Sequence, residues 1–384
     1  MVIEGELVVR LACAGGRVRQ VAVHSTRPMV AARLLTGKTA VDAAAVVPRL
    51  FSICGGAQGT AAAAALAAAG ATGREFDFAS RDREVMLEAL QDTFWHLLID
   101  WPNTMSTAPC ATPVAAARFQ IASAMRASDG TPRLNDVAAM RELGVALSAI
   151  AAQAIFGMPP AAWRQLADVE ALQAWCARGE TIAAILLGHV LTDWPTLGRS
   201  ATRLMPSPQR DTLLRVIVPA LRRGSEFSRA PNWNGETVET GGLARMREDP
   251  LVQAVQQMFG NAVVTRVVAR LSELARMLHE LSGPDLETTR SPRIQSLPLG
   301  DGEGLAAVET ARGLLLHRAR LQEQCVADYQ IVAPTEWNFH PAGALVRGLE
   351  GLAAGDDQHL AGAARLAAHA LDPCVAFRVE VGHA

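Results

Sequence analysis

The sequence lacks a long apolar run and an excess of charge of either sign. Of its 384 residues, 50% are hydrophobic and 19% are charged, which is an ordinary globular composition. No run of roughly 18 or more apolar residues occurs, so we expect no membrane insertion. The 36 basic and 38 acidic side chains leave a formal net charge of -2. This balance argues against a nucleic-acid-binding protein, which would need a basic face.

The N-terminal segment also lacks the features of a secretion signal. A charged start, an apolar stretch and a small-residue cleavage site do not follow one another there. We therefore expect a cytoplasmic protein. The cysteines form no CxxC pair and no repeated short spacing, so in a reducing compartment they are expected to be free thiols or metal ligands. They are Cys13, Cys54, Cys110, Cys176, Cys325 and Cys374.

Common catalytic and nucleotide-binding signatures are missing as well. There is no P-loop, no GxGxxG segment after a predicted strand, no HExxH and no GxSxG. The nine histidines include no pair at the i, i+4 spacing of a helical metal site. A lone histidine such as His279 on an apolar helix is far more often a core or surface residue than a ligand. The cysteines therefore remain as the candidates for chemistry.

The pattern that is present is mainly helical, with β-structure near both ends. Alternation around Gly15-Gly16 predicts an opening β-hairpin over residues 6–13 and 18–25. A second antiparallel pair is predicted near the C-terminal end, at 313–320 and 326–333, and the segment after Cys374 reads as a short tail. Apolar residues at three- and four-residue spacing predict helices at 83–98, 113–126, 134–156, 161–178, 181–191, 251–281 and 360–371. We therefore expect an α+β protein that is mainly α.

Two cysteines have unusual backbone contexts. Cys54 precedes Gly55-Gly56 and an alanine-rich helix over 60–69, where the helix dipole and free N–H groups favour thiolate over thiol. Cys374 follows Asp372-Pro373 after the predicted last helix. From composition alone, two small buried apolar residues remain the simpler interpretation.

Six stretches, in order along the chain, resemble the conserved motifs of nickel-iron hydrogenase large subunits. The first cysteine stretch, Ile53-Cys54-Gly55-Gly56-Ala57, is similar to the family's C-G-x-C-x-x-x-H, and the last, from Asp372, is similar to its D-P-C-x-x-C-x-x-H. The matching stretches are 3–7, 53–61, 239–245, 309–317, 329–338 and 372–380. The resemblance implies one large-subunit-like domain over residues 1–384, shortened in the middle. It also implies a helical core in which the two cysteine turns meet.

The departures from these motifs bear on activity. In the family, each cysteine motif supplies two thiolates to a nickel and to an iron that carries two cyanides and one carbon monoxide. Here the second cysteines are replaced by Ala57 and Phe377, and the closing histidines by Ala61 and Glu380. Two thiolates cannot build the bridged pair of metals, so the resemblance implies no nickel and no hydrogen-oxidising enzyme.

The residues that match imply a holder for the iron half alone. Cys54 and Cys374 would supply two soft sulfur ligands to iron that already carries its diatomic ligands. Arg312 and Thr335 match groups that donate hydrogen bonds to the cyanides in the family. The remaining matches are two carboxylates that pair with that arginine and a proton-relay glutamate, namely Asp100, Asp372 and Glu4.

The pattern of one cysteine per motif looks like the hydrogenase expression/formation proteins of the HupK/HoxV kind. That resemblance implies a maturation scaffold, which receives the Fe(CN)2CO unit transiently from machinery that includes a HypC-type chaperone. It then passes the unit to the nickel-iron hydrogenase large-subunit precursor. Two alternatives stay open at this point: a redox protein with a mononuclear iron, and a metal-free interaction protein that serves the hydrogenase subunits.

Overall fold

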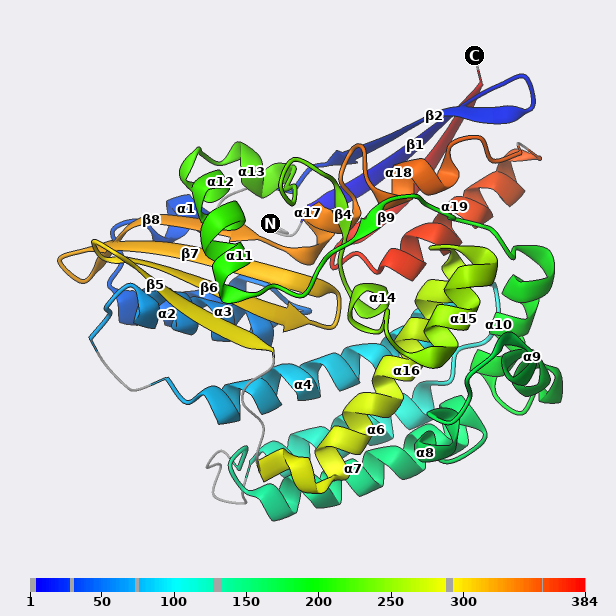
Figure 1. Ribbon diagram of the computed structural model, residues 1–384, viewed down its shortest axis with the longest axis horizontal. Helices are drawn as coiled ribbons and strands as arrows, with labels where there is room; N and C mark the ends of the chain where they lie inside the picture. Colours follow the sequence, from blue (N-terminus) through cyan, green and yellow to red (C-terminus); the bar gives the residue numbers. More distant parts are fainter. Residues whose placement is uncertain are drawn as a thin grey trace.

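Two β-sheets border a body of helices in this protein. The structure is a computed structural model and describes residues 5–27, 31–72, 76–126, 133–287, 293–353 and 355–383. A four-stranded sheet lies at one end and a three-stranded sheet along one side, with the long helices beneath them (Figure 1). The predicted α+β class, with mainly helical content, is confirmed.

The three-stranded sheet joins the two ends of the chain. The predicted hairpin is confirmed as β1 (Glu6–Ala14) and β2 (Arg17–Ser25), which pair antiparallel. The predicted tail is wrong, because residues after Cys374 form a third strand, β9 (Ala376–His383), parallel to β1. Phe377, Val379 and Val381 alternate with Arg378, Glu380 and Gly382, which is a strand signal that the sequence analysis missed. The pairing ties the segment beside Cys374 to the N-terminal hairpin.

The four-stranded sheet is antiparallel, in the order β5-β6-β7-β8. Its strands are β5 (Ile294–Gly300), β6 (Glu303–Thr310), β7 (Gly313–Gln322) and β8 (Cys325–Val332). The predicted pair over 313–320 and 326–333 is confirmed as β7 and β8. The sequence analysis missed β5 and β6, because β6 is buried on both faces and shows no alternation of apolar and polar residues. The tight β6–β7 turn carries Arg312.

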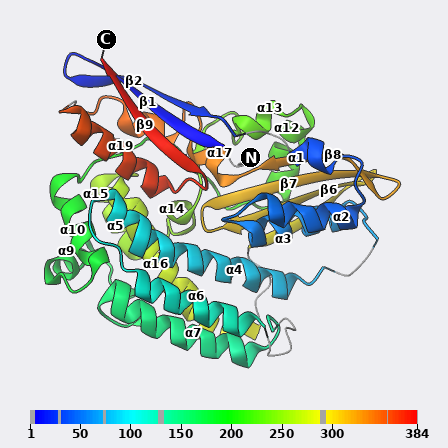
Figure 2. The ribbon, with the colours of Figure 1, turned by 180° about the vertical axis from the view of Figure 1, so that it is seen from behind.

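The alanine-rich helix α3 (Gly55–Ala68) lies along this sheet (Figure 2). Small residues allow the close approach, since Ala61, Ala62 and Ala65 have no exposed surface. On the facing strand, a Cβ atom at Gly304 would overlap the backbone of Ala65 and of the residues that follow it. The absent side chain at this position therefore sets the distance between helix and sheet.

We expect Gly304→Ala to destabilise the protein by about 1–3 kcal/mol, the usual cost of overpacking a core. Equilibrium unfolding in urea measures the change. Gly362→Ala in α19 (Asp357–Leu371) is the matched control, because its Cβ would meet no atom within 4 Å. The control should be neutral or up to about 1 kcal/mol more stable, as alanine favours a helix interior. Equal effects at both positions would contradict the packing argument.

The helical body follows the predicted helices with two corrections. The range 161–178 breaks into α8 (Pro160–Trp163) and α9 (Val169–Arg178). The range 251–281 breaks into α15 (Pro250–Phe259) and α16 (Val263–Ser282), because Gly260 has a φ of 72° that ends α15. The other long helices are α4 (Phe78–Trp95), α6 (Ala111–Met125), α7 (Val137–Ala151) and α10 (Ile182–Asp193).

Shorter elements complete the described chain. The early ones are α1 (Ala31–Leu35), α2 (Ala40–Val46), η1 (Val47–Leu50), α5 (Trp101–Thr104), and the π-helices η2 (His96–Asp100) and η3 (Ala152–Phe156). The later ones are β3 (Arg203–Leu204), α11 (Arg210–Thr212), η4 (Leu213–Ile217), α12 (Val218–Arg222), α13 (Glu226–Arg229), β4 (Val238–Glu239), α14 (Gly242–Arg245), η5 (Pro284–Glu287), α17 (Pro334–Asn338) and α18 (Ala344–Leu349).

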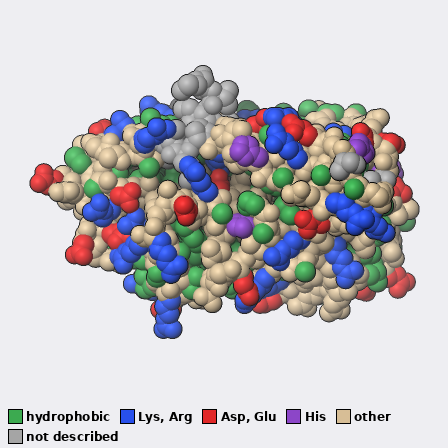
Figure 3. Space-filling model, turned by 90° about the horizontal axis from the view of Figure 1, so that it is seen from above, with side chains coloured by type: hydrophobic (Ala, Val, Ile, Leu, Met, Phe, Trp, Pro, Cys, Tyr) green, Lys and Arg blue, Asp and Glu red, His purple; other side chains and the backbone are tan. Residues whose placement is uncertain are grey.

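The surface gives no sign of a single-charge face on the side seen in Figure 3, where acidic and basic side chains are interspersed. Among the described residues, one helical stretch, Val137–Phe156, is long and apolar enough to cross a membrane. Of its most apolar window, 44% is buried inside the protein, and core helices of globular proteins meet the same criterion.

Candidate functional site

The two predicted cysteines meet although they lie near opposite ends of the chain. Cys54 is the residue before α3, and Cys374 lies between α19 and β9. Both are free cysteines, and their thiols lie close enough for each to shift the pKa of the other. Cys374 is buried and Cys54 is half-buried. Two sulfur ligands are thus available at one point in the interior.

The surroundings of the two sulfurs favour a thiolate at Cys374 more than at Cys54. The interaction with Cys54, together with Arg27 and Arg312, lowers the pKa of the Cys374 thiol despite burial. The Thr335 hydroxyl lies 3.1 Å from the Cys374 sulfur and adds to this stabilisation. The neighbouring Cys374 and burial raise the pKa of the Cys54 thiol.

The expected preference of Cys54 for the thiolate form is wrong for this pair. The N–H groups of Gly56 and Ala57 at the start of α3 donate to the Glu88 carboxylate, at 2.7 and 3.1 Å. Glu88 therefore occupies the positive end of the helix that would otherwise stabilise a charged sulfur. Burial, followed by repulsion from Asp92, raises the pKa of Glu88 to about 7 in spite of these two hydrogen bonds.

This raised pKa predicts a pH-dependent stability. Unfolded Glu88 ionises near its ordinary pKa of 4.5, while the folded carboxyl has a pKa of about 7. Between these values the folded protein holds a proton that the unfolded chain has lost, so stability falls as pH rises. Relative to Glu88→Gln, the wild type should lose stability from pH 4.5 to about pH 7 and then level off.

Urea unfolding over this pH series measures the difference. Glu84→Gln, one turn earlier on α4, controls for the removal of a carboxylate from that helix. A stability difference between wild type and Glu88→Gln that does not vary with pH would contradict the raised pKa.

Arg312 is buried beside the sulfur pair and held by two carboxylates. Its Nη1 atom donates to Asp92 Oδ2 at 2.6 Å, and its Nε atom lies 3.3 Å from Asp372 Oδ1. Arg270 Nη1 lies 2.9 Å from the second oxygen of Asp372. Burial opposes ionisation of Asp372, but Arg312 and Arg270 outweigh it and hold the pKa of this carboxyl well below its usual range. The predicted pairing of Asp372 with Arg312 is present.

The predicted pairing of Asp100 with Arg312 is not. Asp100 accepts a hydrogen bond from Trp95 Nε1 at 3.0 Å, and burial followed by the charge of Asp372 raises its pKa to about 6. Asp92, two turns earlier on α4, makes the ion pair instead. Glu4, the other predicted carboxylate, lies outside the described residues.

A sequence signal for Asp92 was available. Glu88, Asp92, His96 and Asp100 recur at every fourth residue, which places them along one face of α4 and the π-helix η2. His96 Nδ1 lies 3.6 Å from Asp372 Oδ1, and burial lowers the pKa of this histidine well below its usual range. A polar stripe on a helix that is otherwise buried indicates a site rather than a solvated face.

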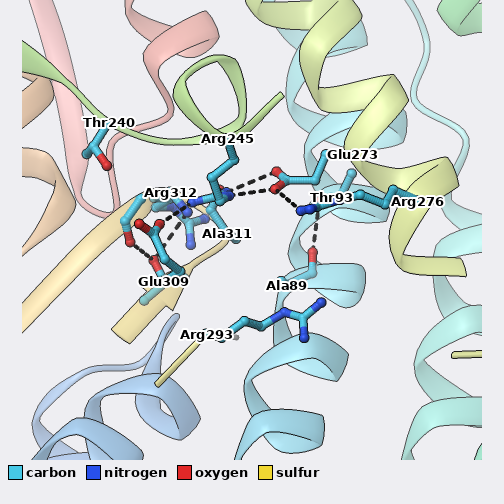
Figure 4. A network of polar contacts seen from close by, with 12 residues as sticks. Ala89, Thr93, Thr240, Arg245, Glu273, Arg276, Arg293, Glu309, Ala311 and Arg312 are labelled. Carbon is cyan, nitrogen blue, oxygen red and sulfur yellow. Dashed lines mark hydrogen bonds and ion pairs between the residues drawn. The ribbon is translucent and has the colours of Figure 1, made fainter. Parts of the chain in front are cut away.

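A further ion-pair network fixes the turn that carries Arg312 (Figure 4). Arg245 donates to Glu273 at 2.6 Å, to Glu309 at 2.7 Å and to the carbonyl oxygen of Ala311 at 3.3 Å. Burial opposes ionisation of Glu273, but the charge of Arg245 outweighs burial and lowers the pKa of this carboxyl to about 2. The two motif-like stretches 239–245 and 309–317 are therefore linked in the structure, because Arg245 of the first holds the turn of the second in place.

Relatives of known name share almost the whole chain. A hydrogenase expression/formation protein HoxV from Cupriavidus necator is 31% identical, with 97% of this chain and 96% of the relative covered. A HupV protein of the same description from Azotobacter chroococcum is 32% identical, with 99% of each chain covered. The chain belongs to the HoxV/HupK family of hydrogenase expression/formation proteins.

The wider relationship of this expression/formation protein is to hydrogenase large subunits. The family model for nickel-dependent hydrogenase matches residues 251–380. The solved Ni-Fe-Se hydrogenase from Desulfomicrobium baculatum is similar with a TM-score of 0.54 at 16% identity, covering 95% of both chains. A Ni-Fe-Se hydrogenase from D. vulgaris Hildenborough gives 0.52 at 18% identity, covering 94% of both chains. At these identities the likeness establishes the fold alone.

The residues that replace the second cysteines and the closing histidines of the hydrogenase motifs have defined places in the structure. Ala57 and Ala61 are fully buried in α3. The Phe377 ring packs edge-on against His369, 5.0 Å between centroids, and Glu380 pairs at the surface with Arg10 and Arg378. Within the described part of the chain, no group of three or more His, Cys, Asp or Glu side chains is arranged to hold a metal ion.

Arg27 is a site residue that the sequence analysis missed. Its charge acts on both thiols, its Nη1 atom donates to Glu336 Oε1 at 3.1 Å, and its guanidinium lies over the Phe51 ring. A cavity of about 380 Å³ is lined by Arg27, Glu336 and Thr335 among others. The cavity reaches Thr335, whose hydroxyl contacts Cys374. No local pattern marks Arg27, because only the fold brings it to the cysteines.

Proposed function

We propose that this protein is a hydrogenase maturation scaffold that holds an Fe(CN)2CO unit between Cys54 and Cys374. The observation that carries the proposal is the pairing of two buried sulfurs, with no third protein ligand in the described chain, among groups that recognise anions. Two soft thiolates suit a low-spin iron that already has three strong diatomic ligands. Bare iron or nickel would need more ligands from the protein.

Capture of the iron unit replaces a proton of the sulfurs with metal. As two sulfur–iron bonds form, the bonds of the unit to its donor chaperone break, and the proton displaced from the sulfurs passes to solvent. Release of this proton costs little free energy, because the buried positive charges of Arg27 and Arg312 stabilise a second negatively charged sulfur.

Hydrogen-bond donors beside the sulfurs suit the cyanide ligands. The Nε–H group of Arg312 is buried and lies 3.3 Å from Asp372 Oδ1, but the geometry of this ion pair is not that of a hydrogen bond. The Thr335 hydroxyl, buried next to Cys374, can rotate from the sulfur toward a ligand. Cyanide nitrogens accept hydrogen bonds, so an iron-bound cyanide would satisfy both donors.

Delivery and release follow from the incomplete ligand set. In this proposal a HypC-type chaperone supplies the unit in the cytoplasm, and the nickel-iron hydrogenase large-subunit precursor receives it. Transfer is favoured because the recipient offers more thiolates than the two present here. The protein is then a non-catalytic carrier without nickel.

The decisive measurement is the infrared spectrum of protein purified anaerobically from its native host. We expect two cyanide bands and one carbonyl band in the wild type, and none in Cys54→Ala, since one sulfur cannot retain the unit. Cys176→Ala, a half-buried cysteine of α9, is the matched control and should keep all bands.

Other spectra would point elsewhere. A blank wild-type spectrum from folded, iron-free protein would support the metal-free interaction protein. Iron without cyanide or carbonyl bands, together with turnover of an electron acceptor, would support the mononuclear-iron redox protein. Full bands in Cys54→Ala would refute the ligand assignment.

Thr335→Val tests the cyanide contact. If the hydroxyl donates to one cyanide, the variant should move one of the two cyanide bands and leave the carbonyl band in place. If it donates only to Cys374, all three bands should move together, because the sulfur then gives more charge to the iron. Thr93→Val, a buried threonine whose hydroxyl donates to Ala89 within α4, is the control and should change no band.

A further inference from the structure

We propose that Gln58 is a positioning residue that donates a hydrogen bond to the Cys54 sulfur and so weakens this sulfur as an iron ligand. His317 and Tyr329 fix the direction of that bond. The inference rests on the proposed iron cargo for its consequence, but the hydrogen-bond chain itself belongs to the protein without cargo.

The three side chains form a continuous buried chain from the sheet to the sulfur. Gln58 Nε2 lies 3.8 Å from Cys54 Sγ, one helical turn away on α3. Gln58 Oε1 lies 2.9 Å from His317 Nε2, and His317 Nδ1 lies 2.7 Å from Tyr329 Oη. None of the three is more than 1% exposed. Since α3 packs against β6 and β7, the sheet holds the amide in place.

The chain has one consistent direction. Burial lowers the pKa of His317 to about 3 and raises that of Tyr329 above its usual range, so both are neutral near pH 7. Tyr329 then donates to Nδ1 of His317, whose Nε2–H donates to the amide oxygen of Gln58. The Gln58 N–H group is left to face the sulfur.

The orientation of the amide agrees with this direction. Gln58 Nε2 faces the Cys54 sulfur, and Oε1 lies 2.9 Å from His317 Nε2. A carbonyl-type oxygen only accepts hydrogen bonds, so an unprotonated Nε2 at this place would face a second acceptor.

The consequence concerns retention of the cargo. A hydrogen bond to a thiolate ligand withdraws charge from the sulfur and reduces what it gives to the metal. Cys374 has a similar contact with the Thr335 hydroxyl, so both sulfurs are weakened donors. A carrier that must give up its iron gains from such ligands, whereas a permanent metal centre does not.

The first test needs no cargo. In protein labelled with 15N histidine, the ring nitrogen shifts of His317 should be those of the neutral Nε2–H tautomer, with the signals assigned by their loss in His317→Gln. The Nδ1–H tautomer would mean that the amide is reversed and would overturn the proposal.

The second test uses the cargo-loaded protein. In Gln58→Leu the carbonyl band should move to lower wavenumber, because the sulfur gives more charge to iron and iron gives more to the carbonyl. Release of the unit to a recipient should be slower. Tyr329→Phe, which removes only one hydroxyl, should move the band in the same direction by less. Thr60→Val is the matched control, a fully buried residue two positions along α3 whose hydroxyl has no hydrogen-bond partner in the described chain.

The outcomes separate this inference from the proposed function. A wild type without cyanide and carbonyl bands refutes the iron cargo, and the tautomer measurement still decides the direction of the chain. Wild-type bands that Gln58→Leu moves no more than Thr60→Val does would overturn the role of Gln58 alone.

Discussion

The geometry of the site depends on the burial of one positive charge. A guanidinium cannot lie in the interior without negative partners, and Arg312 obtains them from two distant segments, Asp92 on α4 and Asp372 beside Cys374. The turn between β6 and β7, the long helix and the C-terminal cysteine must therefore come together for any one of them to be stable. Loss of either carboxylate would leave an excess of buried positive charge.

The same requirement explains why the surroundings of the cysteines are so rich in charge. Arg312 and Arg27 favour negative sulfur, while Glu88 takes up the positive start of α3 and keeps it from Cys54. The two sulfurs therefore lie between buried positive and negative side chains, none of which belongs to the cysteine motifs except Asp372.

Much of the fold could be predicted from the sequence. The elements that were missed were missed for different reasons. The hairpin β1–β2 and the pair β7–β8 showed alternation, whereas β6 is buried on both faces. Strand β9 also alternates, but its partner β1 lies at the other end of the chain, so no local hairpin pattern marked it. The break at Gly260 was hidden because apolar spacing continues across it.

Some residues of the site were likewise predicted from the sequence, and others were not. Cys54, Cys374, Arg312, Thr335 and Asp372 were identified from motif resemblance, and the structure brings them together. Asp100 was named from motif resemblance and Asp92 was not considered, although both lie on the same four-residue series along α4 and η2; only the fold shows that Asp92 pairs with Arg312. The contact of Gln58 with His317 and those of Arg27 with the two cysteines join segments far apart in sequence, and no local pattern predicts them.

The parallel pairing of β1 with β9 also sets an order of events during synthesis. Strand β1 leaves the ribosome hundreds of residues before β9, and a parallel partner cannot be replaced by a local hairpin. Cys54 is likewise made long before Cys374. A nascent chain can therefore fold its helices early but cannot bring both sulfurs together until translation has passed β9. An unfinished polypeptide therefore lacks the paired-cysteine site, which exists only in the completed chain.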